Sequence, residues 1–234
     1  LLVQAIGALC ATSLLTSQVM AQSEKIEEVV VTGSRIARNN ATEAASPVTV
    51  IGGDTLRTSG QVDIGELLRE SPQLNNSLPA NFSAINGAGT VDSDVGLGLL
   101  DLRGLGAQRT LTLVNGRRHV AGGQGTAAVD VNSIPTVLVQ RIETLTGGAS
   151  SVYGADAVSG VVNFVLKEGG DFDGIEVTAQ TGMSSRYDSD EQYLSVATGF
   201  EWADGRGEAV IAIEGLRNSE VLESDRYFAG PYQG

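Results

Sequence analysis

Ile142 to Lys167 reads IETLTGGASSVYGADAVSGVVNFVLK, and this stretch decides the fold. Two strand patterns, Arg141 to Leu145 and the apolar run Val161 to Leu166, flank a turn rich in glycine, serine and alanine. Glycine permits tight turns and close backbone contact because it has no Cβ, and four glycines serve here: Gly147, Gly148, Gly154 and Gly160. Asn163 is the polar exception in the second run, so we expect its side chain to hydrogen-bond a neighbouring loop.

The composition favours a packed core with many turns. The 234 residues are 41% hydrophobic and include 30 glycines, and they could form one large domain or two small ones. The formal net charge is −13, and residues 1–22 carry no charged side chain, so the acidic excess lies in the remainder. Because such a surface repels phosphate backbones, nucleic acid is not an expected partner.

Residues 1–21, LLVQAIGALCATSLLTSQVMA, are apolar or small, which is typical of a secretory signal peptide ending at a small-residue cleavage site. The basic segment and the initial Met of such a signal are missing, so we expect the sequence to begin inside it. A single membrane helix is the alternative, and the polar residues and the lack of a cationic flank disfavour it. Cleavage would remove Cys10, the only cysteine, and exclude disulfides from the mature chain.

Local patterns predict the first elements after the signal peptide. Three β-branched residues at Val29–Val31 favour extended backbone, and Pro47–Ile51 alternates like a strand. Asp63 with Glu66 three residues later is typical of a capping box that opens a short helix, which should end at Ser71-Pro72.

The middle of the chain predicts further strands and a turn. We expect strands at Leu99–Gly104 and Thr110–Val114, then a hairpin turn at Asn115-Gly116 before Arg117–Val120. Pro135 could open a short helix because its fixed φ suits the first helical position.

The last part of the chain changes character at about Asp171. Three segments of alternating residues come after it, at 174–183, 191–202 and 208–218. In the second, one side carries Leu194, Val196, Phe200 and Trp202, and the other carries Tyr193, Ser195, Ala197 and Gly199. This pattern suits tilted membrane strands with one lipid face and one lumen face. An ordinary antiparallel sheet over a soluble core is the alternative from pattern alone.

Four motifs, in this order, resemble the plug domain of TonB-dependent outer-membrane receptors. They are Glu27 to Gly33, Leu102-Arg103-Gly104-Leu105-Gly106 leading into Leu111 to Arg117, Asp130 to Pro135 running into Gln140 to Glu143, and the opening stretch. The resemblance implies an α+β plug domain, a small mixed β-sheet with short helices, followed by the first antiparallel strands of an incomplete transmembrane β-barrel.

The first motif is similar to a TonB box, made of Glu27, Glu28, Val29, Val30, Val31, Thr32 and Gly33. An extended, β-branched segment can add as a strand to the sheet of a partner. The resemblance implies that this partner is TonB, acting with ExbB and ExbD. The alternative is that Val29–Val31 is simply the first strand of the plug.

The resemblance also assigns a latch and a ligand surface. Arg103 and Arg141 stand where family members direct plug arginines at glutamates of the barrel wall, although either could be solvated at a strand end. Ligand contact would come from the loops 75–94 and 119–126, with the candidates Asn81, Asn86, His119 and Gln124. Most residues of these loops could equally lack ligand contact. His119, the only histidine, is poor evidence for a metal site, and we expect no metal or cofactor.

Motifs of enzyme chemistry are absent from the sequence. The segment 104–109 lacks the third glycine of a dinucleotide fingerprint, nothing matches a P-loop, and no G-x-S-x-G elbow occurs. We therefore do not expect an enzyme.

The resulting expectation is a receptor of the bacterial outer membrane that binds a small extracellular ligand, such as an iron chelate, cobalamin or oligosaccharide, and imports it using energy from TonB. The expected parts are a signal peptide (1–21), a TonB box and linker (22–46), a plug (47–170) and the start of a barrel in contact with lipid (171–234). Plugged transporters have about 22 strands, so most of the barrel would lie outside this sequence. The alternatives are a secreted glycine-rich β-domain that binds carbohydrate, and an outer-membrane usher or adhesin.

Overall fold

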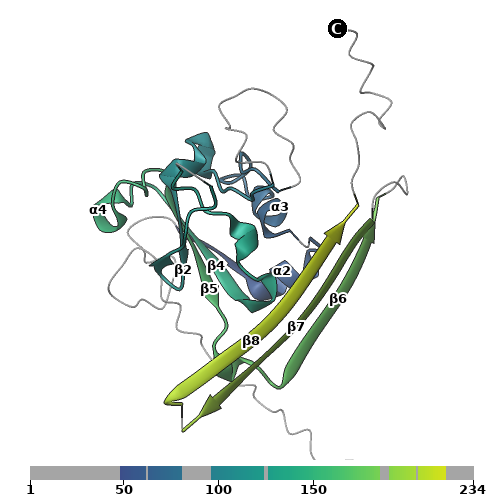
Figure 1. Cartoon of the computed structure of the whole chain (residues 1–234). Coiled ribbons are helices and arrows are strands. Elements are labelled where there is room, and N and C mark those ends of the chain that lie inside the picture. The colour runs from purple at the N-terminus through teal and green to yellow at the C-terminus, as the bar shows by residue number, and fades with distance from the viewer. Residues whose placement is uncertain are drawn as a thin grey trace, which may run out of the picture.

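Two β-sheets, connected by residues 167–174, form the structure (Figure 1). The fold is known from a computed structural model that describes residues 48–61, 63–80, 96–123, 126–184, 190–203 and 205–219. The expected signal peptide and TonB box lie outside these residues.

The first sheet is mixed, with the strand order β1-β4-β5-β2-β3. Its strands are β1 (Val48–Gly52), β2 (Thr110–Val114), β3 (Arg117–Arg118), β4 (Val139–Thr146) and β5 (Gly160–Leu166). β2 and β5 run parallel, and the other neighbouring pairs are antiparallel. The two strands expected from the opening stretch are thus confirmed as the centre of this sheet.

Short helices and 3₁₀ turns connect the strands of the mixed sheet and lead into the second sheet. They are α2 (Gly53–Thr58), α3 (Ile64–Arg69), α4 (Ser150–Tyr153) and the 3₁₀ turns η3 (Leu102–Gly104), η4 (Ala107–Arg109), η5 (Val131–Ser133), η6 (Thr136–Leu138) and η7 (Gly169–Asp171). Asp63 caps α3 as expected, because its Oδ1 accepts hydrogen bonds from the N–H groups of Gly65 at 2.6 Å and Glu66 at 3.3 Å. The turn η6 follows Pro135, where the sequence predicts a short helix. No helix in the described part of the chain combines the length and apolar character needed to cross a membrane.

The core lies on both faces of the mixed sheet because successive strand residues point to opposite sides. On β5, Val162 and Phe164 are fully buried in one apolar cluster with residues of α2 and α3. Val161, the neighbour of Val162, belongs to the second cluster with Leu111 and Leu145. An apolar run buried on both faces is typical of a central strand, which explains why residues 161–166 are almost uniformly hydrophobic.

The prediction of a strand at Leu99–Gly104 is wrong. Leu99 makes only isolated bridges, to Leu78 and Asp130, and residues 102–104 form the turn η3. Arg103 has a φ of 62°, in the left-handed region, so the extended backbone cannot continue through it.

The hairpin at Asn115-Gly116 is confirmed, although its second strand is only two residues long. Both turn residues have positive φ, 48° and 72°, as the tight hairpin turn requires. The side chain of Asn163 accepts a hydrogen bond from the Gly116 N–H at 2.9 Å. The sequence-based prediction that Asn163 bonds a neighbouring loop is therefore correct.

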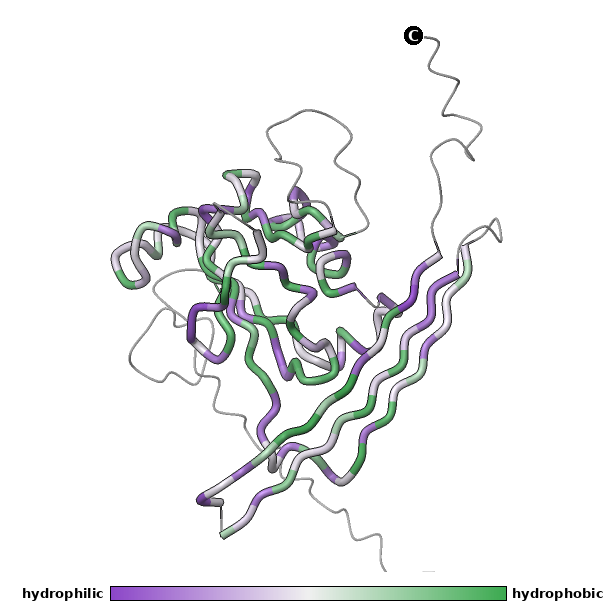
Figure 2. Tube along the Cα trace, in the orientation of Figure 1, coloured by the Kyte–Doolittle hydropathy of each residue, from purple (hydrophilic) through white to green (hydrophobic). Residues whose placement is uncertain are grey.

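The second sheet is antiparallel, in the order β6-β7-β8, and consists of β6 (Ile175–Met183), β7 (Asp190–Trp202) and β8 (Gly207–Asn218). Its strands are long and its hydrophobic residues alternate with polar ones (Figure 2). Tyr193, Ser195 and Ala197 are buried against the first unit, which is the mixed sheet with its short helices. Leu194 and Val196 are exposed on the opposite face. This is the division of sides expected from the sequence. The proposed domain limits themselves stay a prediction.

Candidate functional site

Several predicted site residues fall outside the described residues: the TonB box Glu27 to Gly33, and the ligand candidates Asn81, Asn86 and Gln124. Their roles stay predictions. His119 is described and half-buried, with its Nδ1 3.2 Å from the carbonyl oxygen of Val120. Within the described ranges, no three His, Cys, Asp or Glu side chains are grouped as a metal site requires.

Arg103 and Arg141 lie in different settings. Arg103 is exposed on η3, and its backbone N–H donates to the carbonyl oxygen of Gln73 at 2.8 Å. Arg141 lies on β4, where its Nε donates to Glu143 at 2.8 Å and its Nη1 donates to Gln140 at 2.8 Å. The Glu143 side chain is fully buried, so Arg141 compensates a charge inside the first unit. The expected pairing of both arginines with barrel glutamates stays a prediction.

The contact between the two sheets contains an ion-pair cluster that sequence reasoning missed. Glu176 on β6 accepts hydrogen bonds from Arg57 of α2 at 2.8 Å and from Lys167, just after β5, at 2.7 Å. Its two carboxylate oxygens bind different partners, Oε1 for Arg57 and Oε2 for Lys167. Alternation marks Glu176 as a residue of the inward face, but nothing in the sequence indicates its partners, which are distant in the chain.

Arg57 has a second partner on its own helix. Asp54 accepts a hydrogen bond from Arg57 Nη2 at 2.6 Å. This hydrogen bond is the main reason why the pKa of Arg57 lies above its ordinary value. In turn, the hydrogen bond and the charge of Arg57 lower the pKa of Asp54. Both groups are therefore ionised at neutral pH.

Beside this cluster lies a crevice between the first unit and the antiparallel sheet. Its lining comes from both sides: Leu56, Arg57, Gln61, Thr136 and Val137 from one, and Glu176, Thr178, Gln180, Tyr193 and Ser195 from the other. The Gln180 side chain donates a hydrogen bond to the carbonyl oxygen of Gly60 across the crevice. The Ser195 hydroxyl is buried in this contact, two residues along β7 from Tyr193. The crevice thus combines apolar surface from Leu56 and Val137 with the polar groups of Glu176, Gln180 and Ser195.

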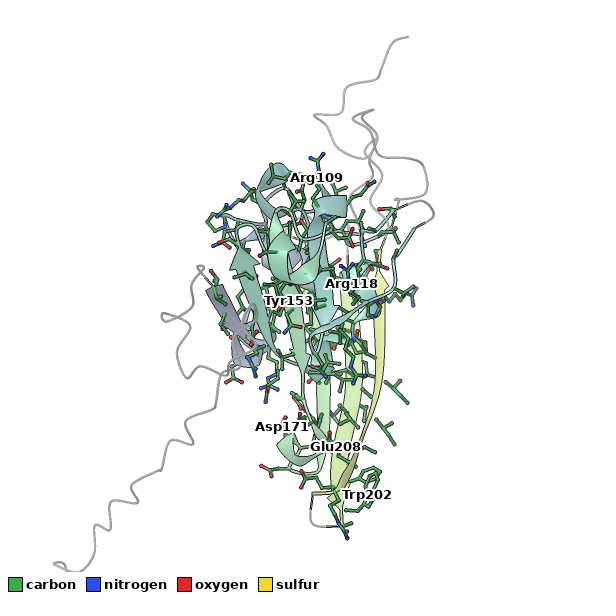
Figure 3. All side chains as sticks on the ribbon, turned by 90° about the vertical axis from the view of Figure 1, so that its left-hand side faces the viewer. Arg109, Arg118, Tyr153, Asp171, Trp202 and Glu208 are labelled. Atoms are coloured by element: carbon green, nitrogen blue, oxygen red, sulfur yellow. The ribbon has the colours of Figure 1, made fainter. Side chains whose placement is uncertain are left out.

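A tighter contact ties η7 to the antiparallel sheet. A Cβ at Gly199 of β7 would lie 2.6 Å from the Phe172 ring and 2.8 Å from the Gly169 carbonyl oxygen, so only glycine fits there. The Gly169 N–H donates to Glu208 of β8 at 3.0 Å. Figure 3 shows Asp171, Glu208 and Trp202 together at one end of the molecule, far from Arg109. This end is held by close packing of the η7 backbone and the Phe172 ring on Gly199, together with the hydrogen bond to Glu208.

Comparison with known families identifies this architecture. Residues 40–161, more than half of the chain, match the family described as TonB-dependent Receptor Plug Domain. The chain therefore belongs to this family. We name the unit from β1 to η7 the plug, and the sheet β6–β8 the wall.

Solved receptors share the fold. The ferric enterobactin receptor PfeA from Pseudomonas aeruginosa, in complex with BCV-L6, is 20% identical with a TM-score of 0.53, over 73% of this chain and 24% of that one. The siderophore receptor PiuA from Acinetobacter baumannii is 20% identical with a TM-score of 0.52, over 74% and 21%. The chain spans about a quarter of the length of these receptors. Its fold is a plug domain with a mixed sheet and short helices, followed, within the described residues, by three antiparallel strands that do not close into a barrel.

Proposed function

We propose that this chain forms the plug and first wall strands of an outer-membrane receptor that binds an extracellular solute and imports it with energy delivered by TonB. TonB, with ExbB and ExbD, would engage the segment Glu27 to Gly33 on the periplasmic side. Outer-membrane lipid would cover the outward face of the wall. Family membership supports this reading over a secreted carbohydrate-binding domain or an usher.

One observation carries the proposal: the plug packs on the polar face of the wall and leaves the apolar face uncovered. Glu176, Thr178 and Ser195 line the contact with the plug, whereas Val177 and Ile213 are 62% and 73% exposed. A soluble sheet would do the opposite, because burial of apolar surface drives its packing. An apolar outward face and a polar inward face are the arrangement of a transmembrane barrel wall.

The solute would be a small extracellular ligand such as an iron chelate, cobalamin or oligosaccharide. An iron chelate is the first to test, because the two similar receptors are named a ferric enterobactin receptor and a siderophore receptor. In the host bacterium, the gene is deleted, and uptake of radiolabelled ferric enterobactin, cyanocobalamin and maltodextrin is measured. We expect loss of one uptake, restored by the full-length gene and absent in a strain without TonB. Uptake that depends on the gene but persists without TonB contradicts the proposal.

The TonB box gives a sharper prediction, although it lies outside the described residues. Val30→Pro removes a backbone N–H and fixes φ, so the segment can no longer complete a strand pairing with TonB. We expect uptake to fall to the level of the strain without TonB, while binding of the same solute to whole cells is unchanged. The control Val30→Thr keeps a β-branched residue and should retain uptake. Normal uptake by the Val30→Pro receptor refutes the assignment.

A further inference from the structure

Glu176 joins two parts of the plug that occupy different places in the sheet. Arg57 belongs to α2, which directly follows β1, and β1 is an edge strand that pairs only with β4. Lys167 follows β5, which lies between β4 and β2, and precedes the tight η7 contact. One carboxylate of the wall therefore binds the N-terminal edge of the plug and its C-terminal end at the same time.

The charges around Glu176 allow α2 to separate from the wall without leaving an unpaired charge on either side. Arg57 is 45% exposed and would take its own counter-ion, Asp54, along on the same helix. Glu176 would keep Lys167, which is only 9% exposed. Removing one partner of a buried ion pair is costly because the other charge is left uncompensated, and this arrangement avoids that cost on both sides.

The crevice lies on the side of the plug that carries α2. Across it, the contacts are side-chain hydrogen bonds such as that of Gln180 to Gly60, and the buried Ser195 side chain lines it. At the other side, the backbone contact between Gly169 and Gly199 leaves no such space.

We propose that the plug opens for the solute along the β6–β7 face beside α2, and that Glu176 is the latch: it releases Arg57 while it stays paired with Lys167. This deepens the proposed function, since it names the route and the residues that control it. α2 is the moving side, and η7 is the fixed side. Arg57 and Lys167 thus have opposite effects on opening, although both bind the same carboxylate.

The test uses the full-length receptor in isolated outer membranes, with Ser195→Cys as a reporter of opening. A water-soluble maleimide labels this cysteine only when the crevice admits it, so the labelling rate measures local opening. Arg57→Gln should raise the rate roughly two- to fivefold, the range for loss of a partly exposed ion pair. Lys167→Gln should lower the rate, because release of Arg57 would then leave Glu176 unpaired.

A merely structural role predicts a different pattern, because loss of either cation would loosen the contact and raise the rate. The proposal is overturned if Arg57→Gln and Lys167→Gln change the labelling rate in the same direction. It is also overturned if the Ser195→Cys reporter stays unlabelled in the Arg57→Gln receptor. Ala157→Cys, fully buried in the second apolar cluster, is the control for general unfolding, and its labelling should be equal in all variants. The assay needs neither TonB nor a solute, so its failure is distinguishable from failure of the proposed import function.

Discussion

At the residue scale, Asp63 decides where α3 begins. Its side chain satisfies two N–H groups that the first turn of the helix leaves without intrahelical partners. Burial raises the pKa of the Asp63 carboxyl above its ordinary value, and the hydrogen bonds from Gly65 and Glu66 oppose this shift without cancelling it. The cap is therefore useful as a hydrogen-bond acceptor but costly as a buried charge.

Asp63→Ala should destabilise α3 by about 1 kcal/mol, and Asp63→Asn should retain the cap. The measurement is hydrogen exchange of the α3 amides in the full-length receptor, where about 1 kcal/mol corresponds to roughly fivefold faster exchange. Comparable exchange in the Asp63→Ala and Asp63→Asn receptors would show that the cap contributes nothing.

The same residue predicts a pH dependence. Because its folded-state pKa is raised, the folded plug binds the proton more tightly than the unfolded chain. The resulting stabilisation is fully present below the unfolded pKa of about 3.9 and is lost as the pH rises through the folded-state value. Relative to Asp63→Asn, which does not titrate there, the native receptor should gain α3 protection as the pH falls through this window. A constant difference between the two receptors would argue against the raised pKa.

Sequence reasoning at this scale succeeded where the reason was local. Asp63 and Asn163 were both assigned their hydrogen bonds correctly, since a capping pattern and a polar residue in an apolar strand can be read without the fold. The partners of Arg57 and Lys167 could not be read in this way. Both bind Glu176, and Arg57 is 119 residues away from it in the chain.

At the scale of elements, strand pattern predicted the two sheets but not their pairing. The strand β2 lies parallel to β5, with Thr110 opposite Gly160, and such a non-local pairing has no sequence signature. The segment Leu99–Gly104 shows the opposite error, since its apolar residues are buried without forming a ladder. Buried apolar residues alone do not distinguish a strand from an irregular segment packed on the core.

Gly199 tests the fixed contact between η7 and the wall. Gly199→Ala would place a Cβ against the Phe172 ring and the Gly169 carbonyl oxygen, and such overpacking costs about 1 to 3 kcal/mol. We expect trypsin to cleave the receptor after Lys167 about fivefold faster or more, as the η7 region detaches more often. Gly215→Ala on β8 is the matched control, because nothing lies within 4 Å of its Cβ position. Equal cleavage of the two variants would show that the contact does not fix the plug.

At the scale of the whole molecule, the two faces of the wall differ in the polarity of their side chains. The inward face meets the plug through groups such as Glu176, Thr178 and Ser195, and the outward face exposes apolar side chains on all three strands, such as Val177, Leu194 and Ile213. Figure 2 shows apolar and polar residues alternating along these strands. The rings of Phe200 and Trp202 lie 5.9 Å apart at one end of β7, where an aromatic girdle would meet the membrane interface. Alternation predicted these faces correctly, but only the position of the plug distinguishes a barrel wall from a soluble sheet, since alternation is common to both.

Ile213→Arg tests whether lipid covers the outward face of the wall. Ile213 is 73% exposed on β8, and an arginine near the middle of a lipid face costs about 2 to 4 kcal/mol. We expect much less folded receptor in the outer membrane, measured as the fraction that shifts in mobility on heating before electrophoresis. Val120→Arg is the control, because Val120 is 76% exposed but belongs to the plug and not to the wall. In a water-soluble protein, both substitutions would fall on solvated surface and be tolerated alike. Equal amounts of the two folded variants would therefore contradict lipid contact at the outward face of the wall, and with it the proposed import function.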